Sequence, residues 1–142
     1  MDGPVIVGTD GSARALQAVD AAVEVACAFD LDLVIVEAYR PTTDLPKGLP
    51  AELADVVTPM SGIEHSLDDA LTRAQEAGAR ATARSVPGDP ADVLLAVAEE
   101  LDAGLLVVGN KGVGSLKRFV VGSVPSKVIH HASCSTYIVH TR

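Results

Sequence analysis

Residues 5–12 run Val-Ile-Val-Gly-Thr-Asp-Gly-Ser, a short β-branched segment that leads directly into a polar turn. Such a segment favours a buried strand, and the glycines and the aspartate that follow favour a turn. Ser12 is a suitable N-cap for a helix that starts behind this turn. The apolar side chains of that helix recur at helical spacing: Leu16, Val19, Val23 and Ala26. We expect its opposite face, with Arg14, Gln17 and Glu24, to meet solvent.

The same alternation of strand and helix continues along the chain. Apolar segments with the composition of strands lie at 31–38, 81–86, 105–108 and 136–139. Helical periodicity covers 60–74, 90–101 and 123–131, with Asp89 and Ser123 as N-caps of the last two. Strands that alternate with helices predict a parallel sheet covered on both faces. We therefore predict an α/β fold, with residues 1–142 as one domain: a Rossmann-like, open, five-stranded parallel sheet with helices on both faces.

The composition excludes several classes of protein. Aromatic residues make up only 3% of the 142 residues, and there is no tryptophan, so the stacking surface of a single-stranded nucleic-acid binder is missing. No apolar run approaches the roughly 18 residues of a membrane span, and we expect no signal peptide. Cys27 and Cys134 lack metal-ligand spacing, and we expect both to be reduced core residues. The prediction is a cytoplasmic protein that binds neither nucleic acid nor membrane.

Charge is distributed unevenly along the sequence. All 19 acidic residues lie at or before Asp102, in a stretch that holds 6 of the 11 basic residues and so carries a net charge of −13. Residues 103–142 hold the other 5 basic residues and no acid. Chance in a short apolar segment explains part of this difference. The functional interpretation is that the segment meets an anion.

The acid-free segment contains a glycine-rich loop, residues 109–123, between a predicted strand and a predicted helix. Glycine lets backbone N–H groups approach a phosphate closely, and a helix amino terminus favours negative charge. The residues that suit this chemistry are Gly109, Gly112, Gly114, Gly122, the hydroxyls of Ser115 and Ser123, and the charges of Lys111, Lys117 and Arg118. The alternative interpretations, which need no ligand, are that Ser123 only caps its helix and that Lys117 and Arg118 are solvated surface charges.

Two familiar phosphate motifs do not fit this loop. A dinucleotide fingerprint needs glycine where Lys117 stands, and a P-loop needs lysine where Asn110 stands. No catalytic triad, HExxH sequence or nucleophile elbow is present, and we interpret the four histidines as ordinary surface or packing residues.

The spacing that does fit is Gly-x2-Gly-x9-Gly-Ser, formed by Gly109, Gly112, Gly122 and Ser123. With it, the chain resembles the universal stress protein family, in its ATP-binding branch. The resemblance covers nearly the whole chain and includes Val5–Ser12, Leu105–Asn110, Gly122–Val128 and Tyr137–Thr141. It implies a five-stranded sheet and a homodimer that is often joined through the last strand. An exposed sheet edge at 136–139 makes such a partner physically reasonable.

The resemblance also implies a set of nucleotide-binding residues. Asp10 lies beside the ribose or a metal-bound water, with no direct metal ligand in the chain, and the backbone around Ala38 reads the adenine edge. The full implied set is Gly8, Thr9, Asp10, Ala38, Val108, Gly109, Asn110, Lys111, Gly112, Gly114, Ser115, Gly122, Ser123 and Val124. Many members carry proline where this chain has Gly8, which leaves the shape of the ribose pocket open.

The predicted function is that of a small cytosolic ATP-binding regulatory protein of the stress response, with Mg²⁺ as an optional companion of the nucleotide. The alternatives are a cyclic AMP-binding member of the same family and a weak ATPase or autophosphorylating protein. Efficient catalysis is not expected, because no second carboxylate is placed as a general base for Asp10.

Overall fold

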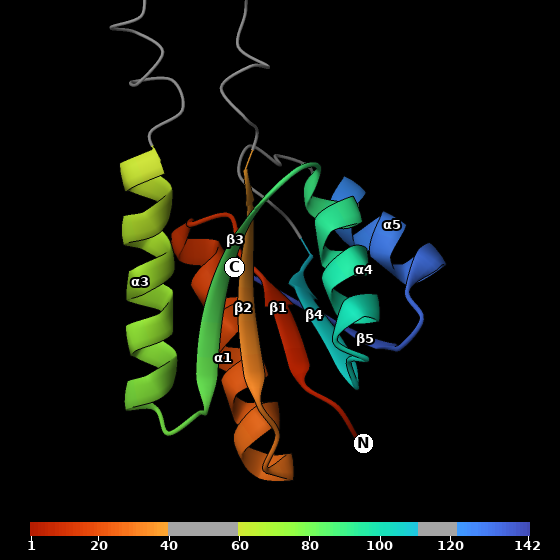
Figure 1. Ribbon diagram of the computed structural model, residues 1–142, viewed down its shortest axis with the longest axis horizontal. Coiled ribbons are helices and arrows are strands. Elements are labelled where there is room, and N and C mark those ends of the chain that lie inside the picture. The colour runs from red at the N-terminus through yellow and green to blue at the C-terminus, as the bar shows by residue number, and fades with distance from the viewer. Residues whose placement is uncertain (40–59, 111–121) are drawn as a thin grey trace, which may run out of the picture.

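The computed structural model describes residues 1–39, 60–110 and 122–142, and of residues 60–65 the backbone alone. The strands are β1 (Val5–Gly8), β2 (Leu33–Tyr39), β3 (Ala81–Pro87), β4 (Leu105–Gly109) and β5 (Ser135–Val139). The helices are α1 (Ala13–Phe29), α3 (Met60–Glu76), α4 (Pro90–Glu100) and α5 (Ser123–His131) (Figure 1). Every predicted strand and helix is confirmed, and β2 begins at Leu33, two residues later than predicted.

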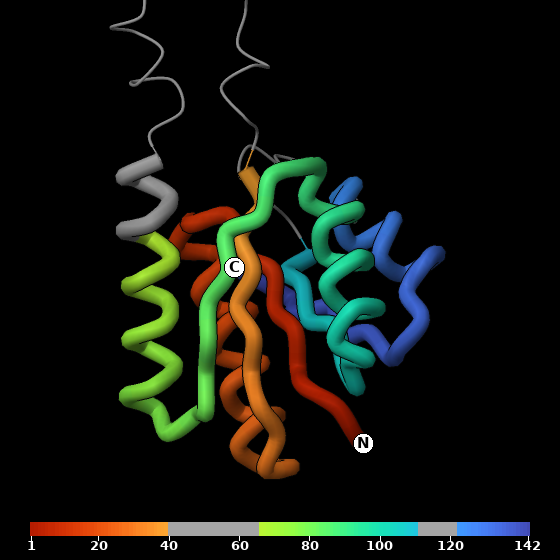
Figure 2. Tube along the Cα trace, in the orientation of Figure 1, coloured from red at the N-terminus to blue at the C-terminus, as the bar shows by residue number. Residues whose placement is uncertain are grey.

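The five strands form one parallel sheet in the order β3-β2-β1-β4-β5. The central strand is β1, which pairs Val5 with Leu33 of β2 on one edge and with Leu105 of β4 on the other. Segments about 100 residues apart in the sequence therefore lie side by side, as the trace shows (Figure 2). The predicted Rossmann-like, five-stranded parallel sheet is confirmed.

Helices cover both faces of the sheet, and each face has its own apolar core. On one face, α1 and α3 pack against β1, β2 and β4 through Val19, Ala22, Leu67 and Ile35. On the other face, α4 and α5 pack through Leu94, Val97 and Val128 against Ile6 and Leu106 (Figure 1). The side chains of both cores are aliphatic. The cores are filled without aromatic residues because β-branched side chains of the strands pack closely against alanine-rich helices.

Capping explains where two of the helices begin. Ser12 accepts a hydrogen bond from the backbone N–H of Ala15 at the start of α1, and Asp89 accepts one from Asp92 at the start of α4. Both predicted caps are confirmed. The predicted cap at Ser123 is wrong: Gly122 is the N-cap of α5, with extended backbone and no side-chain cap, and Ser123 is already helical. The hydroxyl of Ser123 is therefore not used as the cap.

The two cysteines are free thiols, as predicted, but they do not both lie in the core. Cys134 is half-buried against the α4–α5 core, and burial raises the pKa of its thiol. Cys27 is exposed, so its predicted core position is wrong. It follows Ala26, the last buried residue of α1, and the helical turn carries it to the outer face.

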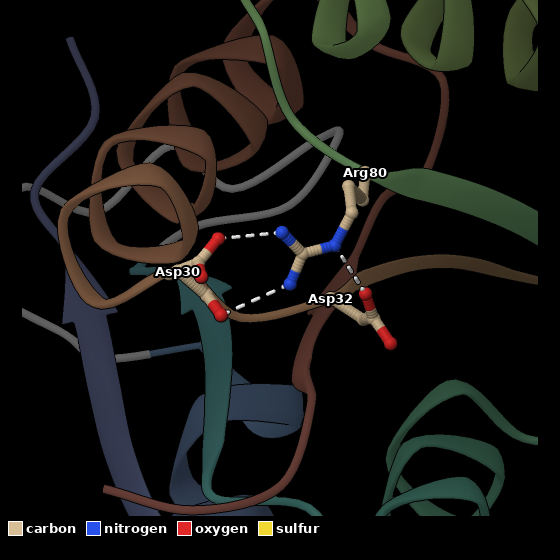
Figure 3. A network of polar contacts seen from close by, with 3 residues as sticks. All are labelled: Asp30, Asp32 and Arg80. Atoms are coloured by element: carbon tan, nitrogen blue, oxygen red, sulfur yellow. Dashed lines mark hydrogen bonds and ion pairs between the residues drawn. The ribbon is translucent and has the colours of Figure 1, made fainter.

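The amino-terminal edge of the sheet is held by an ion-pair network. Arg80 directly precedes β3. It forms ion pairs with Asp30, which follows α1, and with Asp32, which precedes β2 (Figure 3). Both acids hold the pKa of the guanidinium above its ordinary value. A cavity of about 490 Å³ opens at this edge between β2 and β3, lined in part by Asp32, Arg80 and Arg84. It lies at the opposite end of the strands from the predicted nucleotide-binding residues.

Gly8, at the end of β1, packs directly against the buried side chain of Leu94 from α4. A Cβ atom at Gly8 would lie 2.6 Å from Cδ1 and 3.1 Å from Cδ2 of Leu94. Real Cβ contacts are not this short, so any larger residue at position 8 must displace the leucine. The strand therefore ends in glycine for a packing reason.

We expect Gly8→Ala to lower the free energy of unfolding by about 1–3 kcal/mol through overpacking. Leu94→Ala alone should cost about 2–5 kcal/mol, because it leaves a cavity. In the double variant the new methyl group no longer meets the leucine side chain. Its free energy of unfolding should therefore equal or exceed that of Leu94→Ala alone, because alanine suits a strand better than glycine does. Urea denaturation of the four proteins measures the coupling, and purely additive effects would contradict this account.

Candidate functional site

The carboxyl ends of β1 and β4 lie next to each other at the point where the strand order reverses: β2 and β3 lie on one side of β1, and β4 and β5 lie on the other. The β1–α1–β2 connection covers one face, and the α4 connection from β3 to β4 covers the other. In open parallel sheets, the crevice at such a switch point is where ligands bind. Of the predicted residues, Gly8 ends β1 and is followed by Thr9 and Asp10, and Gly109 ends β4 and is followed by Asn110, so the fold brings the two groups together.

The turn after β1 is built around Asp10. One oxygen of this carboxylate, Oδ1, accepts hydrogen bonds from the backbone N–H of Ser12 at 3.0 Å and from its hydroxyl at 2.6 Å. The Thr9 hydroxyl accepts from the N–H of Gly11, and the Thr9 N–H donates to Val36 of β2. The turn is thus fixed by its own side chains, and Asp10 is exposed at the crevice.

A buried acid lies beneath this turn. Glu37, in β2, is only 4% exposed, and its oxygens lie 3.2 and 3.5 Å from the hydroxyl of Ser66 in α3. Gly11 covers the pair with a positive φ of 83°, and a Cβ there would lie 3.1 Å from Oε1 of Glu37. Glycine at position 11 therefore serves both the left-handed backbone and the close approach to the acid.

The environment of Glu37 favours its protonated form. Burial raises the pKa of this carboxyl above its ordinary value of 4.5, and the nearby charge of Asp10 raises it further. The hydrogen bond with Ser66 acts in the opposite direction but is the smaller effect. The site therefore contains two neighbouring acids in different surroundings, one exposed and one buried.

The exit of β4 is held by Asn110. Its backbone N–H donates to the carbonyl of Val139 at 2.9 Å, which continues the pairing with β5. Its side-chain Oδ1 accepts from both the N–H and the hydroxyl of Thr141, at 2.9 and 2.8 Å. The side chain thus contacts Thr141, which follows β5. The backbone carbonyl of Asn110 accepts a hydrogen bond from the N–H of Gly122 at 3.0 Å.

That last bond brings the amino terminus of α5 to the exit of β4. Ser123 and Val124 are the first residues of this helix, and Pro125, the third, has no N–H. The first bond of the helix runs from the N–H of Ser126 to the carbonyl of Gly122. No acceptor in the described part of the chain pairs with the N–H groups of Ser123 and Val124. These two amides carry the partial positive charge of the helix end.

The positive charges of the acid-free segment are partly neutralised by the fold. Lys127 of α5 lies 2.6 Å from Asp92 and 3.9 Å from Asp89, at the amino end of α4. These acids raise the pKa of its ammonium group. Lys127 therefore serves the packing of α4 on α5, and the charge asymmetry seen along the sequence is smaller in three dimensions.

The remaining predicted residues fall into two groups. Ala38 is half-buried in β2, where it pairs in register with Val86, and Val108 is buried in β4. Lys111, Gly112, Gly114 and Ser115, together with Lys117 and Arg118, lie outside the described residues. Within the described ranges, no group of three or more His, Cys, Asp or Glu residues is arranged to hold a metal ion, and no helix is long and apolar enough to span a membrane.

Sequence reasoning missed the partners of several polar residues at this edge. Glu37 stands out in the sequence as an acid within an apolar strand, but nothing in the sequence points to Ser66. Gln17, predicted to face solvent, bonds to the backbone of Arg142. Thr141, which is 4% exposed, lies in a stretch that carries the family resemblance, but nothing in the sequence points to its contact with Asn110.

These features define the class of protein: a doubly wound α/β protein with polar residues at the switch point of its sheet and a helix amino terminus beside them. The family model of the universal stress protein family matches residues 1–140. The chain belongs to this family.

Relatives match along almost the entire chain. Universal stress protein Rv1636 of Mycobacterium tuberculosis (strain H37Rv) is 41% identical, over 96% of this chain and 95% of the relative. A solved universal stress protein in complex with cAMP is 36% identical, with a TM-score of 0.77, and covers 99% of this chain and 98% of that one. UspA from Lactobacillus plantarum, at 22% identity and a TM-score of 0.80 over 98% and 99% of the chains, shares the fold.

The buried acid gives a pH-dependent contribution to stability. Because the native state holds the Glu37 proton at higher pH than the unfolded chain does, the free energy of unfolding should fall as pH rises above 4.5 and through the raised native pKa. Glu37→Gln keeps a hydrogen-bonding partner for Ser66 and should lose this decline. Urea denaturation at several pH values measures it, with Glu24→Gln on the exposed face of α1 as control. A constant difference between wild type and Glu37→Gln would contradict the assignment.

Proposed function

We propose that this universal stress protein binds an adenine nucleotide across the carboxyl edge of its sheet, with the phosphate end at the amino terminus of α5. The observation that carries the proposal is the bond from the Gly122 N–H to the Asn110 carbonyl, which brings the two amides of α5 to the exit of β4. Because β4 pairs with β1 in parallel, these amides and the turn of Asp10 lie at the carboxyl ends of neighbouring strands. An anion at one wall and a ribose at the other suit this arrangement.

The individual roles follow the family pattern. Asp10 accepts from the ribose hydroxyls or from a metal-bound water, and Gly8 and Thr9 line the crevice beside it. Ala38 offers its backbone to the adenine edge. Val108, Gly109 and Asn110 form the wall after β4, and Gly122, Ser123 and Val124 hold the phosphates. Lys111, Gly112, Gly114 and Ser115 are proposed, from the family pattern, as further contacts to the ribose and phosphates.

ATP is the first candidate ligand, because the spaced glycine motif is that of the ATP-binding branch and a triphosphate carries the most charge to match helix amides and loop lysines. Cyclic AMP is the second candidate, and a specific observation favours it: the solved relative at 36% identity is a complex with cAMP. We further propose that the protein acts in the cytoplasm, in agreement with its free thiols.

Calorimetric titration with Mg-ATP and with cyclic AMP, followed by competition between them, tests the proposal. We expect saturable binding of at least one nucleotide and mutual displacement at one shared site. A protein that binds neither ligand more tightly than about 1 mM would contradict the proposal.

Gly122→Ala is the matched variant for this titration. Its backbone has an ordinary φ of −61°, and a Cβ there would lie 3.4 Å from the Asn110 carbonyl oxygen and 3.5 Å from Cδ of Pro125, so alanine fits the fold. We expect Gly122→Ala to remain folded, at a cost of about 1 kcal/mol because alanine is a poorer N-cap than glycine, and to weaken ATP binding by on the order of tenfold, and Gly122→Val by more. Unchanged affinity in both variants would place the phosphates elsewhere.

We also propose a homodimer that joins through β5. This strand lies at one edge of the sheet, and Tyr137 is an exposed aromatic side chain in it, 40% exposed. A second copy would cover the unpaired edge and the aromatic ring together.

Sedimentation velocity tests the dimer. We expect the wild type to sediment as a dimer at micromolar concentration and Tyr137→Asp to shift toward monomer, because two like charges would face each other across the symmetric contact. Phe29→Asp is the matched control, since Phe29 is also exposed but lies at the end of α1. A wild-type monomer, or an equal effect of both variants, would contradict this interface.

A further inference from the structure

The three residues after β5 are His140, Thr141 and Arg142; they contact Asn110 at the exit of β4 and Gln17 of α1, and we call them the strap. Thr141 is 4% exposed, which makes it one of two buried polar or charged side chains among the described residues, the other being Glu37. Both lie at the carboxyl edge of the sheet. A buried hydroxyl must be hydrogen-bonded to be tolerated, so its partner identifies what it holds.

The partner of Thr141 is Asn110. Oδ1 of Asn110 accepts from the backbone N–H of Thr141 at 2.9 Å and from its hydroxyl at 2.8 Å. One oxygen thus accepts two hydrogen bonds from a single residue, and this fixes the orientation of the Asn110 side chain. The carbonyl of the same residue accepts the N–H of Gly122. Asn110 therefore links the strap to the amino terminus of α5.

The strap is also bonded to α1. Nε2 of Gln17 donates to the carbonyl of Arg142 at 3.0 Å, and the N–H of Arg142 donates to Oε1 of Gln17 at 3.0 Å. This reciprocal pair holds the backbone of the strap in one register. Gln17 lies in the first half of α1, the helix that follows directly from the Asp10 turn.

A continuous series of hydrogen bonds thus runs from α1 through the strap to Asn110 and on to Gly122. It joins the helix behind the Asp10 turn with the helix whose first amides are the proposed phosphate donors. The sheet places β1 and β4 side by side, but it does not by itself fix how α5 is oriented against α1, because these helices lie on opposite faces.

We propose that Thr141 and Asn110 are positioning residues that hold the amino terminus of α5 at the exit of β4 and thereby set the affinity for the phosphate end of the nucleotide. The inference rests on the proposed function for its ligand. It predicts that loosening the strap weakens contacts to phosphates and leaves contacts to adenosine unchanged, since the adenine and ribose positions belong to β1 and β2.

The variant that tests this is Thr141→Val, which keeps the shape of the side chain and the backbone bond but removes the hydroxyl donor. We expect ATP affinity to fall by on the order of tenfold, while adenosine affinity stays unchanged. In the ligand-free protein, hydrogen exchange of the Gly122 amide should accelerate in Thr141→Val. Thr141→Ser should restore both quantities, because it returns the hydroxyl.

Two further variants serve as comparisons. Thr82→Val makes the same chemical change at an exposed position of β3 and should alter neither quantity. Gln17→Met keeps the length of the side chain and removes both of its bonds to Arg142, so it should act in the same direction as Thr141→Val. Thermal unfolding of each variant gives the temperature range in which all are folded.

Equal losses of ATP and adenosine affinity in Thr141→Val would assign it a general structural role and overturn the inference, as would unchanged ATP affinity. Failure of the proposed function gives a different result. If the wild type binds no adenine nucleotide, the ligand assignment falls, and exchange at Gly122 still decides whether the strap positions α5. Unchanged exchange in Thr141→Val would then overturn the strap as well.

Discussion

The structure depends on strand β1 being paired on both edges and covered on both faces. Its side chains at Val5, Ile6 and Val7 are completely buried, and its backbone bonds to β2 on one edge and β4 on the other. A parallel neighbour can be reached only through a crossover, so the chain must leave β1 over one face and return to β4 over the other. The crevice at the carboxyl ends is a necessary result of this arrangement, independent of any ligand.

The same arrangement concentrates polar groups at one edge of the sheet. Thr9 and Asp10 follow β1, Asn110 follows β4, and Glu37 lies near the carboxyl end of β2, in strands that are otherwise mostly apolar. The structure satisfies these groups with contacts from elsewhere in the chain: Ser66 from α3 and Thr141 from beyond β5. At the opposite edge, the exposed network of Arg80 with Asp30 and Asp32 ties three chain segments in full contact with water. Burial at one edge and solvation at the other give the two ends of the sheet different chemistry.

The fold was predictable because it follows from local periodicity. Short β-branched segments, helical spacing and the caps at Ser12 and Asp89 are all properties of neighbouring residues, and the alternation of elements determines a parallel sheet. The N-cap of α5 was mispredicted because a serine and a preceding glycine are both acceptable caps, and only the extended backbone at Gly122 decides between them. Cys27 was mispredicted because one step around a helix separates a core position from a solvent position.

The candidate site was predictable in its backbone and not in its side-chain contacts. Gly8, Asp10, Gly109 and Gly122 lie in adjacent segments because the strand ends converge, whereas the contacts of Gln17, Ser66 and Thr141 span 125, 29 and 31 residues along the chain. No pattern within one segment encodes such pairs. The charge asymmetry illustrates the difference, since Lys127 is counted as part of a basic segment along the sequence but is paired with Asp92 of α4 in the fold.

Because Lys127 is paired with acids of α4, the anion-binding groups that the described residues offer near Asn110 are the backbone amides of α5. These are the amides of Ser123 and Val124, and Pro125 limits their number, since it cannot donate a third N–H. Backbone donors do not adjust their direction as a lysine does, so their usefulness to an anion depends on how firmly the helix end is held. In this protein that firmness comes from Asn110, whose carbonyl bonds to Gly122 and whose amide oxygen bonds to Thr141. The side chain of Asn110 and the amides proposed to bind phosphate are thus linked through one residue.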